Sequence, residues 1–149
     1  MENGLPLVDF FGELPKLYFA CLRRRMNGEE HAHPRQGPIL CLLLSRDGMS
    51  QADLVRKLDV SAATVAVSIA RLVRLGYVTR ERNMRNQRAN TLYLTEKGRA
   101  EADRMRQAMD ALCGVALAGM SPEERQTLAQ LVRRMEENLR QSYENAERE

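Results

Sequence analysis

The sequence predicts a mostly α-helical protein that carries one β-hairpin, and two observations support this fold class. Aromatic residues make up only 5% of the 149 residues and tryptophan is absent, whereas sheet proteins are rich in aromatic and β-branched residues. Apolar residues also recur at three- and four-residue steps along most of the chain, which is the period of an amphipathic helix. The period changes to that of strands only near residues 77–79 and 91–94.

The N-terminal part predicts a long amphipathic helix from Leu5 to Met26 that ends in a run of arginines. Pro15 leaves two alternatives, because a proline suits the first turn of a helix or kinks its interior. Either the helix begins near Leu14, or it kinks at Pro15. A polar loop follows, and the apolar residues from Ile39 to Leu44 predict a short buried helix.

Two short helices joined by a tight turn are predicted between residues 50 and 76. Ser50 is placed to cap the first helix, and Asp53 follows three residues later to complete the cap. Ser61 is placed to cap the second helix, which runs to Leu75 and is stopped by Gly76. We expect the second helix to bury Val65, Ile69, Leu72 and Val73 and to leave Ala63, Thr64, Val67, Arg71 and Arg74 pointing away.

The strand-like residues after Gly76 predict a β-hairpin with a strongly positive tip. From residue 80 to residue 88 a single acid, Glu81, stands against the arginines Arg80, Arg82, Arg85 and Arg88. Two helices and a tight turn followed directly by a hairpin are the order of a winged helix-turn-helix, whose second helix enters the major groove of DNA. A solvated run of charges is the alternative interpretation of the tip.

This order of elements predicts sequence-specific binding to double-stranded DNA. Small apolar side chains contact thymine methyl groups, threonine and arginine donate hydrogen bonds, and arginines on a wing reach phosphates or the minor groove. The predicted DNA-binding residues are Ser50, Gln51, Ser61, Ala63, Thr64, Val67, Arg71, Arg74, Arg82, Arg85, Asn86, Gln87 and Arg88. Two alternatives stay open: an ordinary exposed face of a core helix, or a winged-helix platform that binds a protein partner without specific DNA binding.

The C-terminal third predicts two helices, one from the Thr95 cap to about Ala116 and one from Pro122 towards Tyr143. The terminal helices offer more apolar surface than one small domain covers, including Phe10, Phe11, Leu128, Leu131, Val132, Met135 and Leu139. A two-fold partner that covers them predicts a homodimer on an inverted-repeat operator, whereas helices that fold back on their own domain are the alternative. The expected parts are an N-terminal dimerisation helix and loop (1–34), the winged helix-turn-helix domain (35–98) and C-terminal dimerisation helices (99–149).

Several short motifs occur together between residues 51 and 98. They are Gln51-Ala52-Asp53-Leu54, Val60-Ser61, Thr64-Val65, Arg71-Leu72, Leu75-Gly76-Tyr77-Val78, Arg88 and Leu92-Tyr93-Leu94-Thr95-Glu96-Lys97-Gly98. This pattern resembles the MarR family of bacterial regulators. The resemblance implies a transcriptional repressor that binds as a dimer with intertwined first and last helices, and an effector site between the helical and DNA-binding parts. The chain departs from the pattern at Asn86, where the family usually has an aspartate that orients an arginine, so we expect a different DNA specificity.

The composition excludes several classes of protein. No stretch approaches the roughly 18 apolar residues of a membrane span and the N-terminus lacks a secretion signal, so we expect a cytoplasmic protein without a membrane partner. The chain has two histidines, no nucleophile motif and no glycine-rich phosphate loop, so we expect that it is not an enzyme and has no cofactor. The scattered cysteines predict neither a disulfide nor a zinc site, and Cys41 and Cys113 are expected in the core.

Three weaker signals have two interpretations each. Cys21 lies near the arginine run, so it is either a redox-sensing thiol or a small core residue. His31 and His33 are metal-ligand types, but no third ligand is evident and no metal site is predicted. An apolar effector pocket and a dimer core are equally compatible with the set Phe11, Leu14, Tyr18, Met105 and Met109.

Overall fold

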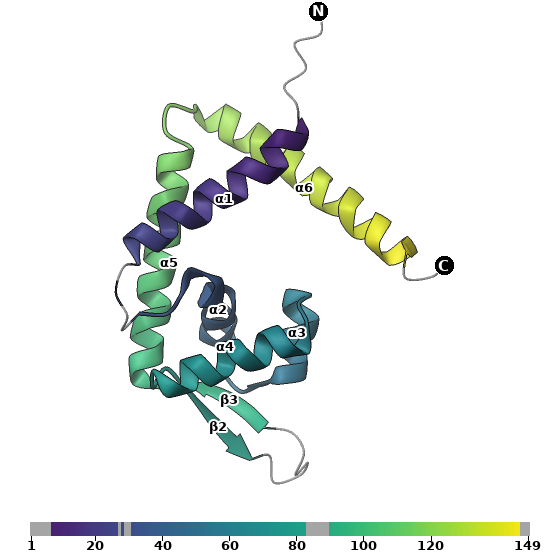
Figure 1. Ribbon diagram of the computed structural model, residues 1–149. Coiled ribbons are helices and arrows are strands. Elements are labelled where there is room, and N and C mark those ends of the chain that lie inside the picture. Colours follow the sequence, from purple (N-terminus) through teal and green to yellow (C-terminus); the bar gives the residue numbers. More distant parts are fainter. Residues whose placement is uncertain (1–6, 27, 29–30, 83–89, 147–149) are drawn as a thin grey trace, which may run out of the picture. The chain divides into compact units, whose positions relative to one another are not determined.

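The computed structural model describes residues 7–26, 28, 31–82 and 90–146. In chain order the elements are α1 (Leu7–Arg25), the 3₁₀ helix η1 (Pro34–Gln36), α2 (Gly37–Ser45), β1 (Met49–Ser50), α3 (Gln51–Leu58), α4 (Ala62–Arg74), β2 (Val78–Arg82), β3 (Asn90–Leu94), α5 (Glu96–Ala116) and α6 (Pro122–Ala146) (Figure 1). The chain divides into two compact units, residues 1–112 and residues 113–149. The predicted class, mostly α with one hairpin, is confirmed.

The first unit is organised around one apolar core to which most of its elements contribute. The largest fully buried side chains are Leu22, Leu40, Leu43, Leu54, Val65, Ile69, Leu72, Val78, Leu92 and Met105. Burying one such side chain stabilises a fold by about 1.5–3 kcal/mol relative to leaving it in water. Because α2, α3, α4 and β3 all supply core residues, the two short helices and the hairpin form one packed body (Figure 1).

The two short helices begin with the caps that the sequence predicts. Ser50 Oγ accepts the Asp53 amide at 3.1 Å while an Asp53 carboxylate oxygen accepts the Ser50 amide at 3.0 Å, which is a complete capping box. Asp59 ends α3 in the left-handed conformation, at φ 51°. Ser61 Oγ then accepts the Thr64 amide at 3.2 Å and starts α4.

The sheet is antiparallel with strand order β1-β3-β2. β2 pairs with β3 from Val78 opposite Leu94 to Arg82 opposite Asn90, which confirms the predicted hairpin. β1 pairs with the other edge of β3, with Met49 opposite Leu92. β1 is absent from the elements predicted by sequence, because two residues are too few to show an alternating pattern.

Three expectations need correction or a choice. α1 runs without a break from Leu7 to Arg25 with Pro15 inside it, so a start near Leu14 is wrong. Val73 is 38% exposed and lies at the edge of the buried face of α4, because it is about 40° around the helix from Ile69 but about 100° from Leu72. Cys113 is exposed and Cys41 only half-buried, so the expected core position of Cys113 is wrong in the isolated chain. Cys113 follows Leu112, the last buried residue of α5, and its side chain points about 100° around the helix from that of Leu112.

The second unit contains the end of α5 and the whole of α6. Gly119, at φ 82°, turns the chain. Ser121 and Glu124 then cap α6 reciprocally, with the Glu124 amide donating to Ser121 Oγ at 3.2 Å and the Ser121 amide donating to Glu124 Oε2 at 2.8 Å. No residue of α6 is buried in the isolated chain. Its exposed apolar side chains are Leu128, Leu131, Val132, Leu139 and Tyr143.

Candidate nucleic-acid interface

The outward face of α4 combines small apolar and cationic side chains, all of them exposed. The residues predicted to point away from the core do so, namely Ala63, Thr64, Val67, Arg71 and Arg74. Val67 is 72% exposed, although a β-branched apolar residue in mid-helix ordinarily packs against something. Ala63 and Val67 are four residues apart and therefore lie on one stripe, with Arg71 one further turn along it. This stripe can contact base edges at its start and donate hydrogen bonds at its end.

Some of the predicted DNA-binding residues have structural partners at the helix starts. Ser50 and Ser61 use their hydroxyl oxygens to cap α3 and α4. The hydroxyl of Thr64 lies 2.8 Å from that of Ser61, so the two form one polar pair at the exposed start of α4. Gln51 begins α3 and is half-buried. Their role as DNA contacts stays a prediction.

The hairpin carries arginines on its outer strand. Arg80 and Arg82 are exposed on β2, opposite Leu92 and Asn90 of β3. They stand beside Glu81, which is also exposed. The predicted tip residues Arg85, Asn86, Gln87 and Arg88 lie outside the described part of the chain.

A second cationic surface lies where α1, η1 and α4 approach one another in the first unit. One cavity of about 430 Å³ is lined by Lys16, Phe19, Arg23, His33 and Arg35, among others. A neighbouring cavity of about 360 Å³ shares Arg23 and His33 and adds His31 and Arg71. Within the described residues, the linings of these cavities contain cations and no acid. Lys16 pairs with Glu13 at 3.2 Å and His31 lies 3.3 Å from Glu101, so the positive character of the lining comes mainly from Arg23, Arg35 and Arg71. Such a lining favours anions.

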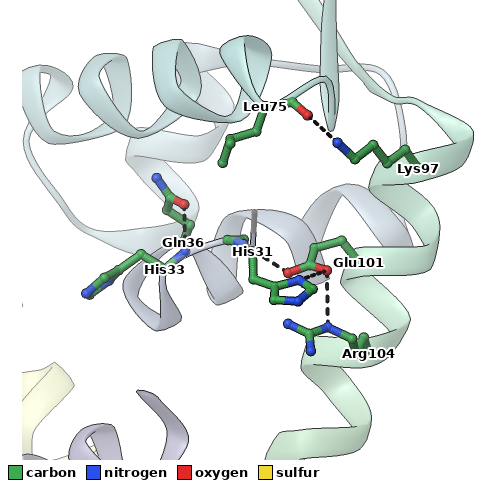
Figure 2. Close-up of polar contacts among 8 residues, drawn as sticks. His31, His33, Gln36, Leu75, Lys97, Glu101 and Arg104 are labelled. Carbon is green, nitrogen blue, oxygen red and sulfur yellow. Dashed lines mark hydrogen bonds and ion pairs between the residues drawn. The ribbon is translucent and has the colours of Figure 1, made fainter. Parts of the chain in front are cut away.

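The pKa of His33 reflects the positive charge of this region. The Nδ1 atom of His33 accepts the Arg35 amide at 3.2 Å and caps η1. The His33 amide donates to Gln36 Oε1 at 3.0 Å, which completes the cap (Figure 2). Burial lowers the pKa of His33, and the nearby charges of Arg71, Arg35 and Arg23 lower it further. An uncharged imidazole fits its role as a hydrogen-bond acceptor.

Glu101 of α5 anchors the chain just before η1. One of its oxygens accepts the Ala32 amide at 2.9 Å, and the other lies 3.3 Å from His31 Nδ1 and accepts from Arg104 Nε at 3.2 Å (Figure 2). Only 5% of Glu101 is exposed, so these partners offset the cost of burying a carboxylate. Glu101 is not among the residues predicted by sequence, because an acid in a helix rich in charges gives no signal until its tertiary partners are known.

The weaker predictions are not tested by these positions. In α1, Phe11 and Leu14 are exposed while Tyr18 is half-buried; in α5, Met105 is fully buried and Met109 is packed against the core. Cys21 also packs partly against the core. Among the described residues no group of three or more histidine, cysteine or acidic side chains is placed to hold a metal ion. Across those same residues, no helix combines the length and the apolar character needed to span a bilayer.

Comparisons with known proteins agree with this architecture. The model of the MarR family matches residues 33–89. The uncharacterized HTH-type transcriptional regulator YdgJ of Bacillus subtilis (strain 168) is 31% identical over 101 residues, which are 68% of this chain and 62% of YdgJ. The chain therefore matches less than two thirds of the length of that relative. A MarR family regulator from Silicibacter pomeroyi is 28% identical with a TM-score of 0.69, over 87% of this chain and 86% of that one.

Two further solved structures are of regulators that bind DNA or respond to a small molecule. A MarR family regulator from Listeria monocytogenes, complexed with 26mer DNA, has a TM-score of 0.71 at 19% identity, over 89% of this chain and 87% of that one. BpsR of Bordetella bronchiseptica, whose DNA binding is regulated by 6-hydroxynicotinic acid, has a TM-score of 0.75 at 22% identity, over 87% of this chain and 98% of that one. At these identities the likeness shows the fold, so the predicted winged helix-turn-helix is confirmed.

Proposed function

Because this chain belongs to the MarR family of transcriptional regulators, we propose that it binds double-stranded DNA as a homodimer and regulates transcription, as a repressor, from an inverted-repeat operator. The observation that carries the proposal is the exposed stripe of α4, where Ala63 and Val67 are followed by Arg71. Apolar side chains at this place would contact thymine methyl groups, and the arginine would donate to a base edge or a phosphate. We infer no catalytic role, and a cytoplasmic location follows from the proposed DNA partner.

The wing adds phosphate contacts to this interface. Arg80 and Arg82 are exposed on β2 and available for phosphate oxygens. The proposed contacts of Arg85, Asn86, Gln87 and Arg88 extend the same interface beyond the described residues. The Listeria monocytogenes regulator solved with DNA supports the use of this fold on a duplex.

The second copy in the dimer covers apolar surface that the isolated chain exposes. In α1 the exposed apolar side chains are Phe10, Phe11, Leu14, Leu17 and Phe19. In the second unit, α6 exposes a further apolar set and buries none of its residues. A two-fold partner covers such surface and places two recognition helices about one turn of DNA apart.

A small anionic effector is the ligand that best fits the cationic cavities. Lys16, Arg23, Arg35 and Arg71 surround space without an acid among the described lining residues. Arg71 belongs both to this lining and to the proposed DNA face, so an anion held there would compete with DNA for one guanidinium. The regulation of BpsR by 6-hydroxynicotinic acid supports an anion of this class. Calorimetric titration of 6-hydroxynicotinate, and separately of inorganic phosphate, into the wild-type protein and into an Arg23→Ala variant tests the site. A heat of binding that is the same for the variant and the wild type would place any binding elsewhere.

The DNA proposal is tested by measuring duplex affinity against salt concentration. Each lost phosphate contact lowers the slope of log affinity against log salt by about 0.9, and a lost base contact costs about 1–3 kcal/mol. Arg71→Ala should therefore weaken binding, whereas Arg140→Ala, which removes an exposed arginine from α6, should leave it within about twofold. Absence of salt-dependent binding by the wild type would favour the alternative of a protein-binding platform.

A further inference from the structure

Consecutive carbonyl groups just beyond the recognition helix α4 are all held by the start of α5. Lys97 Nζ donates to the Leu75 carbonyl at 3.0 Å (Figure 2), and Thr95 Oγ1 donates to the Gly76 carbonyl at 2.6 Å. The Thr95 amide donates to the Tyr77 carbonyl at 3.0 Å. The end of α4 is thus tied to α5 through backbone carbonyls that lie outside the hydrogen bonds of the helix itself.

The helix itself leaves these carbonyls free for such partners. α4 closes in a Schellman motif, in which the Gly76 amide donates to Val73 O at 3.0 Å and the Tyr77 amide donates to Leu72 O at 2.9 Å. Gly76 supplies the left-handed residue that this motif needs, at φ 78°. The Lys97 ammonium then lies at the negative end of the helix dipole and 5.0 Å from the centre of the Tyr77 ring.

The start of α5 packs closely against the turn that follows α4. A Cβ atom at Gly98 would lie 1.9 Å from the Tyr77 carbonyl oxygen, so only glycine fits against this turn. Thr95 Oγ1 accepts the Gly98 amide at 2.9 Å while it donates to Gly76, so one hydroxyl both caps α5 and holds the end of α4. One turn after Lys97, Glu101 holds the Ala32 amide beside the cationic cavities.

We propose that Thr95, Lys97, Gly98 and Glu101 form a latch that sets the position of the recognition helix, and that Lys97 is a positioning residue for DNA binding that does not touch DNA. The proposal rests on the proposed function of α4 as the DNA-binding helix. Loss of the Lys97 hydrogen bond and its charge removes one of the ties to the end of α4, which lets α4 tilt more freely and weakens every operator contact together. The latch also couples the segment beside the cavities to α4, because both are held by one face of α5.

The test compares Lys97→Met, Lys97→Arg and the matched charge removal Arg140→Met on the operator selected by the wild-type protein. Lys97→Met should weaken binding to the operator roughly five- to tenfold, within the range of one net hydrogen bond at an exposed site, and should leave the salt slope unchanged. Lys97→Arg keeps a cationic donor and should stay within about twofold of the wild type. In the free protein, Lys97→Met should speed hydrogen exchange at the Gly76 and Tyr77 amides, while Arg140→Met should not.

Two results would overturn the latch. An affinity for Lys97→Met within about twofold of the wild type, with Gly76 and Tyr77 exchanging at the wild-type rate, would show that Lys97 holds nothing. A salt slope reduced by about 0.9, as for one lost phosphate contact, would make Lys97 a DNA contact instead. The Arg71→Ala variant separates this failure from failure of the proposed function: if it weakens the operator while Lys97→Met does not, α4 still binds DNA and only the latch is wrong.

Discussion

At the scale of single residues, His33 joins the local backbone to the charge of its surroundings. Its Nδ1 accepts a backbone hydrogen bond at the start of η1, which a protonated ring could not do. Burial and then the charges of Arg71, Arg35 and Arg23 hold its pKa below the ordinary value of histidine. The folded protein therefore disfavours the imidazolium, whereas the unfolded chain accepts it.

The lowered pKa of His33 in the folded protein predicts a loss of folding stability in acid. The contribution of His33 is fully present above the ordinary histidine pKa of about 6.5 and is lost as the pH falls through its lower folded pKa. An asparagine at this position can cap η1 without titrating. The unfolding free energy of His33→Asn, from urea denaturation at about pH 7 and about pH 5, should therefore fall less than that of the wild type. An equal fall in both proteins would show that His33 does not contribute to the acid sensitivity.

Gly98 offers a second residue-scale prediction, with a control in the same helix. Gly98→Ala forces a methyl group against the Tyr77 carbonyl and should destabilise the fold by about 2–4 kcal/mol. At Gly114, also in α5, a Cβ would meet no atom within 4 Å, so Gly114→Ala should stabilise by about 0.5–1 kcal/mol through helix propensity. Thermal unfolding of both variants measures the difference. Equal stability of the two variants would contradict the close approach at Gly98.

At the scale of elements, α4 shows which features of the fold can be read from sequence. Ser61 and Gly76 mark its ends because capping chemistry is local, and the buried stripe follows from the helical period. The prediction that Val73 belongs to that stripe is wrong, because periodicity does not locate the edge of a buried face to one residue. β1 and the partners of Glu101 depend on contacts between distant parts of the chain, so no local pattern could predict them.

The cap of α4 allows stability and DNA binding to be separated. Ser61→Ala removes the acceptor for the Thr64 amide and should cost about 1 kcal/mol of unfolding free energy. Ser61→Asp keeps a good cap and should retain that stability, but it places a negative charge at the exposed start of the proposed DNA-binding helix. Operator affinity should therefore fall more for Ser61→Asp than for Ser61→Ala. The reverse order, measured by fluorescence anisotropy, would remove the start of α4 from the DNA interface.

At the scale of the whole molecule, the exposed apolar surface argues for a second copy of the chain. The isolated chain exposes large apolar residues in α1 and in α6, and burying such surface is the main driving force for association. This surplus could be predicted from the apolar pattern of the sequence, whereas the division into parts 1–34, 35–98 and 99–149 stays a prediction beside the two compact units of the structure.

The dimer makes its own prediction at this scale. Light scattering should give twice the 17.0 kDa mass of the chain for the wild type. Leu131→Glu places a charge on the exposed apolar side of α6 and should shift the protein towards the monomer, while Arg140→Ala on the same helix should not. Because each monomer presents one recognition helix, the Leu131→Glu variant should also lose most of its operator affinity. A wild-type mass of one chain would contradict the dimer.

The most direct test of operator binding is selection of sites from a random double-stranded DNA pool by the wild-type protein, repeated with Arg71→Ala. A dimer with two recognition helices one DNA turn apart should enrich an inverted repeat of roughly 16–20 base pairs. Arg71→Ala should weaken that site, because the arginine lies on the exposed stripe of α4. Enrichment of no sequence, or of one that Arg71→Ala binds as tightly as the wild type, would contradict the proposal that α4 reads an operator.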